Sequence, residues 1–208
     1  MKFNKESGQA SRLLLILAVV VLVAVIIVYL VMRMAEKPAQ PAVPKIPAVP
    51  QPVYEQQLGD IRLVFESALD KGNVLTASQI INNQYSYNQQ DLQVSNPGAK
   101  FIAVTVGGQN KGTDNTEKGA WDIQNIVDSQ GRNFVPLDGY TVAPWLPKDN
   151  LCGALLKPAF DPTPCMKIYE VSKASSGLKI RVEEGKNGKA SNFSSGNVDQ
   201  YLLDLIVK

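Results

Sequence analysis

Histidine is absent from this 208-residue chain. Histidine is the commonest general base and a common zinc and copper ligand, so its absence excludes Ser-His-Asp and Cys-His centres. Catalysis by lysine or by a pair of carboxylates would still be possible, but no pair of acidic residues lies in a recognisable catalytic motif. We therefore expect a protein that is not an enzyme and that holds no cofactor and no metal ion.

A large excess of either charge is also absent, with 21 basic and 19 acidic residues. Five of the basic residues and two of the acidic ones fall within residues 1–37, so the remainder of the chain holds 16 basic and 17 acidic residues. Nucleic-acid-binding domains normally show a basic excess. The sequence therefore predicts no nucleic-acid partner.

One long apolar run is present at residues 13–32, "LLLILAVVVLVAVIIVYLVM", without charge, glycine or proline. A helix of this length spans roughly 30 Å, the thickness of the hydrocarbon core of a bilayer. Three basic residues precede the run and two follow it, which favours a cytoplasmic N-terminus over residues 1–12 and an extracytoplasmic C-terminal part. Arg33, two residues before Ala35, makes a poor cleavage site, so we expect an uncleaved signal anchor in the cell membrane.

An alternative for the N-terminus is a prepilin-type leader. A basic segment ends at Gly8, directly before the apolar run. Type IV pilins usually carry Glu at the fifth position after the cleaved glycine, and Leu13 occupies that position here. In this alternative the helix would pack in a filament or another envelope assembly.

A proline-rich segment follows, "PAQPAVPKIPAVPQP" at residues 38–52, with proline at every third position from 38 to 50. Polyproline II has three residues per turn, so the prolines would line one edge of an extended rod. Fifteen residues at about 3.1 Å each reach roughly 45 Å. We interpret residues 33–57 as a linker or stalk.

The rest of the chain, residues 58–208, shows short runs of period-two apolar alternation separated by turns. Such runs occur at 60–67, 100–109, 120–137, 166–172, 177–184 and 201–208. The run at 120–137 is interpreted as two strands joined by the turn "DSQG", in which Gly131 can take a positive φ. Six or more strands with irregular connections predict an all-β fold, an antiparallel sandwich or barrel. Residues 74–86 fit either a short helix or another strand.

Four segments carry a family resemblance: "NPGAKFIAVTVGGQNKG", "WDIQNIVDSQGRNFVP", "LKPAFDPTPCMKIYEV" and "LKIRV". They resemble a prokaryotic exported Ig-like domain family of unknown function, related to the sandwiches of secreted immunoprotective antigens. Its hallmarks fall at Phe101 to Asn110, Asp128 to Phe134 and Tyr169 to Val171. The resemblance covers roughly residues 58–207 and implies an immunoglobulin-like antiparallel β-sandwich, often on a membrane or lipid anchor, without catalytic residues. The long segment at 71–98 and the two cysteines depart from the pattern.

The two cysteines, Cys152 and Cys165, flank a proline-rich segment on the side of the chain that we expect to be exported. An even number of cysteines outside the cytosol favours a disulfide. Free or buried thiols are the alternative. Two cysteines without histidine do not fill a tetrahedral zinc shell.

Three aromatic residues, Trp121, Tyr140 and Trp145, form a candidate ligand face. The alternative places the tryptophans in the core or over the edge of the sandwich.

The stretch "FIAVTVGGQNKGT" at residues 101–113 looks at first like a phosphate-binding loop. Lys111 precedes the second glycine of the motif and Thr113 follows it directly, so no lysine stands where the phosphates need it. We interpret the stretch as a core strand that ends in a glycine-rich bend.

These observations predict a membrane-tethered, extracytoplasmic Ig-like module of the cell envelope that binds another component and is not catalytic. Its expected partners are the lipid bilayer, through residues 13–32, and an envelope protein or surface polymer. The alternative function is a pilin-like or other envelope-assembly subunit.

Overall fold

The computed structural model describes residues 7–35, 51–82, 84, 90–185, 189 and 198–208. The chain divides into two compact units, residues 1–49 and residues 50–208. Residues 36–50, which carry most of the predicted stalk, lie outside the described residues. The stalk therefore stays a prediction.

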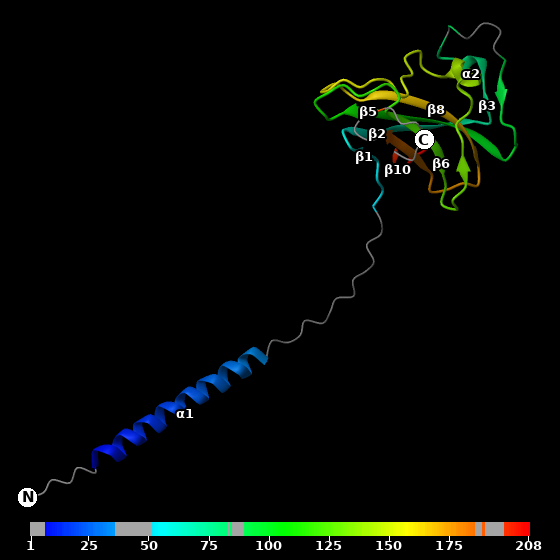
Figure 1. Cartoon of the computed structure of the whole chain (residues 1–208). Helices are drawn as coiled ribbons and strands as arrows, with labels where there is room; N and C mark the ends of the chain where they lie inside the picture. Colours follow the sequence, from blue (N-terminus) through cyan, green and yellow to red (C-terminus); the bar gives the residue numbers. More distant parts are fainter. Residues whose placement is uncertain (1–6, 36–50, 83, 85–89, 186–188, 190–197) are drawn as a thin grey trace, which may run out of the picture. The chain divides into compact units, whose positions relative to one another are not determined.

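The first unit contains one long helix, α1, from Ser7 to Ala35 (Figure 1). Its interior from residue 9 onward has no glycine or proline to interrupt the backbone hydrogen bonds. The stretch Leu15–Met32 is long and apolar enough to cross a membrane. The side chains of residues 15–32 are exposed, so this apolar surface is not covered by protein.

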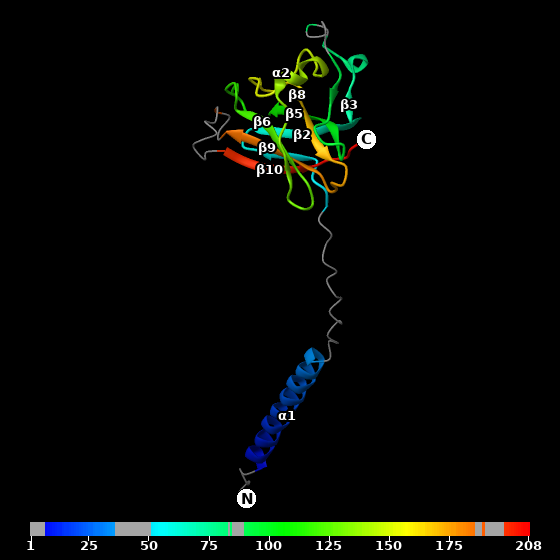
Figure 2. The ribbon, with the colours of Figure 1, turned by 90° about the vertical axis from the view of Figure 1, so that its right-hand side faces the viewer.

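The second unit contains two four-stranded antiparallel sheets (Figures 1 and 2). The first sheet has the order β1-β2-β5-β8 and consists of Glu55–Leu58, Ile61–Gly72, Ala99–Asn110 and Thr163–Ser172. The second has the order β10-β9-β6-β7 and consists of Val198–Asp204, Lys179–Gly185, Trp121–Val127 and Asn133–Phe134. The all-β fold predicted from the sequence is confirmed.

The connectivity is that of an immunoglobulin-like sandwich. Strands β2, β5 and β8 take the places of strands A, B and E, and β10, β9, β6 and β7 take those of G, F, C and C′. The chain changes sheet between β5 and β6, between β7 and β8, and between β8 and β9, whereas β6–β7 and β9–β10 are pairs within one sheet. Strand β1 is an addition at the outer side of β2.

The main core lies between the two sheets. Alternate residues of each strand point into it, as the period-two pattern predicted. Fully buried members from the two sheets include Ile61, Leu63, Ile102, Val104, Trp121, Ile123, Ile180, Val182 and Leu203. Burial of one such large apolar side chain contributes about 1.5–3 kcal/mol, which is why these short runs hold the fold together.

The glycine pair Gly107 and Gly108 lies inside strand β5, not in a bend. Gly108 pairs with Leu63 on one side and with Thr163 on the other, so the strand continues unbroken to Asn110. A Cβ on Gly108 would lie 2.9 Å from three atoms of the Trp121 ring. The glycine pair therefore belongs to the strand and not to the predicted bend, which begins only at Gly112. Glycine is needed at position 108 because a core ring lies against the backbone.

A second cluster covers the outer face of the first sheet. Its buried members are Leu75, Phe101, Ala103, Val142, Trp145 and Ile168. They come from the sheet, from the segment between β2 and β5, and from the short helices α2 (Gly139–Val142) and η3 (Ala143–Trp145). Figures 1 and 2 both show α2 and β3 on the side of β8 and β5 that faces away from β10.

The long segment at 71–98 is part of this cap. It contains β3 (Val74–Leu75), the 3-10 helix η1 (Ala77–Gln79) and β4 (Leu92–Gln93), so it holds both a short helix and short strands. The indole Nε1 of Trp145 donates to the carbonyl oxygen of Thr76 over 2.8 Å. The cap is thus fixed by hydrogen bonds as well as by apolar contact.

The sandwich begins before residue 58, the predicted start. The backbone N–H of Val53 donates to Oδ2 of Asp204, and the N–H of Asp204 donates to the carbonyl oxygen of Val53, each over 2.7 Å. These bonds join the start of the domain to its last strand, β10.

Candidate binding groove between the sheet edges

The edge strands β7 and β8 of the two sheets lie next to each other and then diverge. The segment after β7 reaches β8 through a bridge between Pro136 and Tyr169, and the N–H of Leu137 donates to the carbonyl oxygen of Ile168 over 2.8 Å. Towards the C-terminal end of β8 the two strands separate, because β7 turns back to pair with β6. A hollow of about 490 Å³ opens in this fork.

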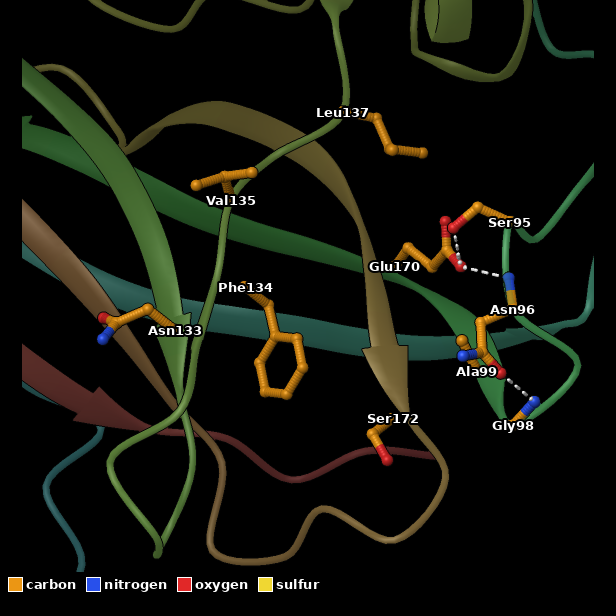
Figure 3. Close-up of a pocket in the computed structure, with 10 residues that line it drawn as sticks. All are labelled: Ser95, Asn96, Gly98, Ala99, Asn133, Phe134, Val135, Leu137, Glu170 and Ser172. Atoms are coloured by element: carbon orange, nitrogen blue, oxygen red, sulfur yellow. Dashed lines mark hydrogen bonds between the residues drawn. The ribbon is translucent and has the colours of Figure 1, made fainter.

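Three walls surround the hollow, which we call the edge groove (Figure 3). The β7 segment, the end of β8 and the turn before β5 each contribute to it. The β7 segment contributes Asn133, Phe134, Val135 and Leu137, the end of β8 contributes Glu170 and Ser172, and the turn before β5 contributes Ser95, Asn96, Gly98 and Ala99. A volume of this size is within the range of small-ligand and side-chain binding sites.

The first wall is positioned by a hairpin built on Asp128. Oδ1 of Asp128 accepts the backbone N–H groups of Gln130 and Arg132, each at 2.9 Å. Oδ2 accepts Nε of Arg132 at 2.6 Å and the hydroxyl of Ser175 at 2.9 Å. Gly131 takes a φ of 76°, a conformation that favours glycine. One carboxylate thus holds the turn that places the following strand, β7.

Burial raises the pKa of Asp128, but the hydrogen bonds from Arg132, Ser175 and Gln130 outweigh it and lower the pKa to about 2. The carboxylate is therefore ionised at neutral pH, which strengthens its four hydrogen bonds. Phe134, two residues beyond Arg132, packs with its half-buried ring against the main core.

The second wall, β8, is tied to the opposite sheet. Nζ of Lys167 contacts Oδ2 of Asp122 on β6 over 2.7 Å and donates to the carbonyl oxygen of Ile123 over 2.6 Å. The buried hydroxyl of Tyr169 donates to the carbonyl oxygen of Gln124 over 2.7 Å. Burial, followed by the charge of Asp122, raises the pKa of Tyr169 well above its usual value, so this hydroxyl stays a donor.

The third wall is a tight turn at residues 95–99. Oδ1 of Asn96 accepts the N–H of Gly98 at 2.8 Å, and the carbonyl oxygen of Asn96 accepts the N–H of Ala99 at 2.9 Å. The carbonyl oxygen of Gly98 accepts the N–H of Lys173 at 2.9 Å. The turn is therefore fastened to the residue that follows β8.

Glu170 joins the second wall to the third. Its Oε1 accepts the hydroxyl of Ser95 at 2.8 Å and the N–H of Asn96 at 3.1 Å, as Figure 3 shows. Burial raises the pKa of Glu170, but the hydrogen bonds from Ser95 and Asn96 outweigh it, so the pKa lies below the usual value. Glu170 is the only ionisable residue among those that line the groove, which therefore carries one fixed negative charge.

The chemistry of the edge groove favours binding over catalysis. Ser95 donates to a carboxylate, but a carboxylate with a lowered pKa is a weak general base at neutral pH. The remaining lining side chains are amides, hydroxyls and apolar groups. A hollow lined by apolar, amide and hydroxyl groups around one oriented charge is instead of a kind that can hold a ligand.

The sequence-predicted aromatic face does not form. Trp121 is 1% exposed in the main core, and its Nε1 donates to the carbonyl oxygen of Ala154 over 2.9 Å. Trp145 is 3% exposed and belongs to the cap cluster, whereas Tyr140 is 91% exposed. The prediction of a shared ligand face is wrong because the two indoles are buried in separate apolar clusters, which agrees with the alternative that placed the tryptophans in the core or over the sandwich.

Cys152 and Cys165 form a disulfide, with their Cα atoms 4.5 Å apart. Asp122 lies close enough to both sulfur atoms to resemble a metal-binding group. Zinc requires thiolate sulfur, which a disulfide does not supply. We therefore assign this cluster a structural role.

Glu170 was not predicted as a site residue, although the sequence carries a signal for it. Met166, Ile168 and Glu170 occupy alternate positions on one face of β8, and a carboxylate takes the third place where the pattern predicts an apolar residue. Two of the three family hallmarks, those ending at Phe134 and at Val171, contribute Phe134 and Glu170 to the groove.

No family model matches the chain, and no curated protein matches it. Similar solved structures are uncharacterised bacterial proteins. A conserved hypothetical protein from Bacillus anthracis is 12% identical, with 74% of this chain and 94% of that chain covered and a TM-score of 0.45. A functionally unknown protein from Listeria monocytogenes EGD-e is 9% identical, with 74% and 82% covered and a TM-score of 0.43.

An uncharacterised β-sandwich protein from Clostridium difficile 630 is 7% identical, with 75% of this chain and 92% of that chain covered and a TM-score of 0.38. Because these TM-scores are below 0.5, they carry no functional argument. The Ig-like family resemblance stays a prediction, and function is argued from this chain's own geometry.

Proposed function

We propose that this chain is a membrane-tethered, extracytoplasmic module of the cell envelope that binds another envelope component and catalyses no reaction. The helix α1 anchors it in the cytoplasmic membrane, and residues 50–208 face the exported side. The exposed apolar stretch Leu15–Met32, in the same chain as a disulfide-bonded sandwich, is the observation that carries this proposal.

The anchor follows from the solvent preference of α1. Eighteen consecutive residues expose apolar side chains, which in water would be strongly unfavourable and in a bilayer are favoured. Three basic residues precede this stretch within the first 12 residues, which favours a cytoplasmic N-terminus.

The exported location of the sandwich is supported by the Cys152–Cys165 bond. Disulfides persist in oxidising compartments outside the cytosol and are rare inside it. The binding role is supported by the edge groove, whose single ionised carboxylate, that of Glu170, is suited to recognition of a ligand.

Cross-linking in intact cells tests the binding role. A membrane-impermeant, lysine-reactive cross-linker is applied to cells that carry either the full chain or residues 1–52 alone, which retain Lys45 as a reactive control. We expect adducts with a second envelope component that require residues 53–208. Adducts that form equally well with residues 1–52 would contradict the proposal.

The same experiment separates the pilin-like alternative. That alternative predicts adducts between copies of this chain, together with a mature N-terminus at Gln9 measured by intact-mass analysis. A second envelope component bound by an unprocessed chain supports the tethered module.

A further inference from the structure

We propose that the edge groove binds a lysine or arginine side chain presented by an extended segment of a partner protein. This inference rests on the proposed function, because an exported binding module is what brings the groove to such a partner. It adds the location of the site and the chemical class of the ligand.

The charge of the groove selects a cation. Glu170 is its only ionisable lining residue and is held ionised by Ser95 and Asn96. Two neighbouring cations are already engaged: Nζ of Lys173 donates to the carbonyl oxygen of Pro97 over 3.0 Å, and Nζ of Lys100 contacts Oδ2 of Asp70 over 2.7 Å. Among the described residues, neither of these ammonium groups is bonded to Glu170, so its charge is available to a ligand.

The apolar lining selects a cation that is carried on an aliphatic stem. Phe134 and Leu137 are partly buried, and Val135 exposes 66% of its surface next to them. Lysine and arginine bury their methylene chains along apolar surface while their charged ends reach a polar partner. A small inorganic cation would leave these apolar groups exposed to water.

The strand edge selects a peptide. β8 is the last strand of its sheet, and the carbonyl oxygen of Ile168 faces outward to accept Leu137. Alternate residues of a strand direct their backbone groups to the same edge, so the carbonyl oxygen of Glu170 and the N–H of Ser172 face outward as well, whereas the carbonyl oxygen of Ser172 already accepts the N–H of Ser175 at 3.0 Å. An extended peptide can run along such an edge while one side chain enters a pocket.

The test uses the full chain in nanodiscs of zwitterionic lipid, which do not attract basic peptides electrostatically. The probes are the acetylated and amidated pentapeptide Ala-Val-Lys-Val-Ala and the same peptide with norleucine in place of lysine. Saturation-transfer NMR titrations measure binding at up to millimolar peptide, with empty nanodiscs as the blank.

Glu170→Gln is the decisive variant, because the amide keeps an oxygen that can accept from Ser95 and Asn96 but removes the charge. Asp149→Asn, on an exposed loop that does not line the groove, is the matched control for loss of one negative charge. Thermal unfolding checks that both variants keep the stability of the parent chain.

We expect the lysine peptide to bind at least about tenfold more tightly than the norleucine peptide, as removal of one charge-assisted hydrogen bond implies. Glu170→Gln should abolish that difference and Asp149→Asn should preserve it. Equal binding of the two peptides, no binding of either, or an unchanged preference in Glu170→Gln would overturn the inference.

A glucosamine oligomer serves as a competing probe. Tighter binding of this amino sugar than of the lysine peptide would also overturn the peptide assignment. The proposed function has a separate test in intact cells, so its failure is distinguishable from the failure of the groove to bind these peptides.

Discussion

Gly108 packs against the ring of Trp121, and this contact explains the second glycine of the pair that was expected in a bend; a Cβ on Gly107 would instead meet Glu66 and Pro162. Nothing in "FIAVTVGGQNKGT" indicates which side chain lies over the glycines, since Trp121 is on a different sheet. Local sequence predicted the strand because its apolar run is local. The reason for Gly108 is a contact between sheets and was not predictable from the local sequence.

Gly108→Ala should destabilise the sandwich by about 1–3 kcal/mol, the usual cost of forcing an extra methyl into a packed core. A Cβ there would lie 2.9 Å from the Trp121 ring, so the ring or the strand must shift. Chemical denaturation of the full chain in detergent measures the loss. Gly139→Ala is the control, because a Cβ at Gly139 meets nothing within 4 Å; equal stability of the two variants would contradict the packing argument.

At the scale of elements, the β6–β7 hairpin was predicted from its turn sequence, and the structure adds the function of Asp128. The pattern located Gly131 and the two strands correctly. It did not indicate that the carboxylate receives bonds from Ser175, because that residue follows β8. Long-range partners of turn residues are outside what a local pattern can show.

Asp128→Asn should lower the free energy of unfolding at pH 7. It should also reduce the amount of stability that the chain loses as the pH falls. The folded-state pKa of Asp128, about 2, lies below the unfolded value near 3.9. Its contribution is therefore present above about pH 4 and is lost as the pH falls through about 2. Denaturation curves at a series of pH values measure both effects.

Asp149→Asn is the control for loss of one negative charge in this series. It should retain the acid sensitivity of the parent chain between about pH 4 and 2. An Asp128→Asn variant with the same pH profile as the parent would show that the hairpin bonds do not stabilise the fold.

The disulfide links Cys152, in the loop before β8, to Cys165 within β8, 13 residues apart. In the chain-entropy model, closing a loop of this length contributes about 3 kcal/mol. Reduction of the wild-type chain should lower its free energy of unfolding by about this amount. Two thiols that react with an alkylating reagent in the native, unreduced chain would contradict the bond.

For the whole molecule, period-two alternation and turn residues sufficed to predict an antiparallel sandwich or barrel, and the choice of the sandwich came from the family resemblance. The cap at 71–98 was noticed as a long segment, but its burial against Phe101 and Trp145 depends on residues far apart in the sequence. The edge groove was not predicted for the same reason: its walls come from three segments that only the sheet order brings together. The one sign of the groove in the sequence was Glu170, which follows Met166 and Ile168 at a position where the alternation predicts an apolar residue.

We propose that α1 spans the cytoplasmic membrane with the sandwich on the exported side. A membrane-impermeant amine-reactive label, applied to cells or spheroplasts with an intact cytoplasmic membrane and followed by peptide mass spectrometry, tests it most directly. We expect labelling of the exposed Lys118, Lys148 and Lys157 before lysis, and labelling of Lys2 and Lys5 only after lysis. Recovery of the chain in the soluble fraction, or labelling of Lys2 and Lys5 but not of the three sandwich lysines, would contradict it.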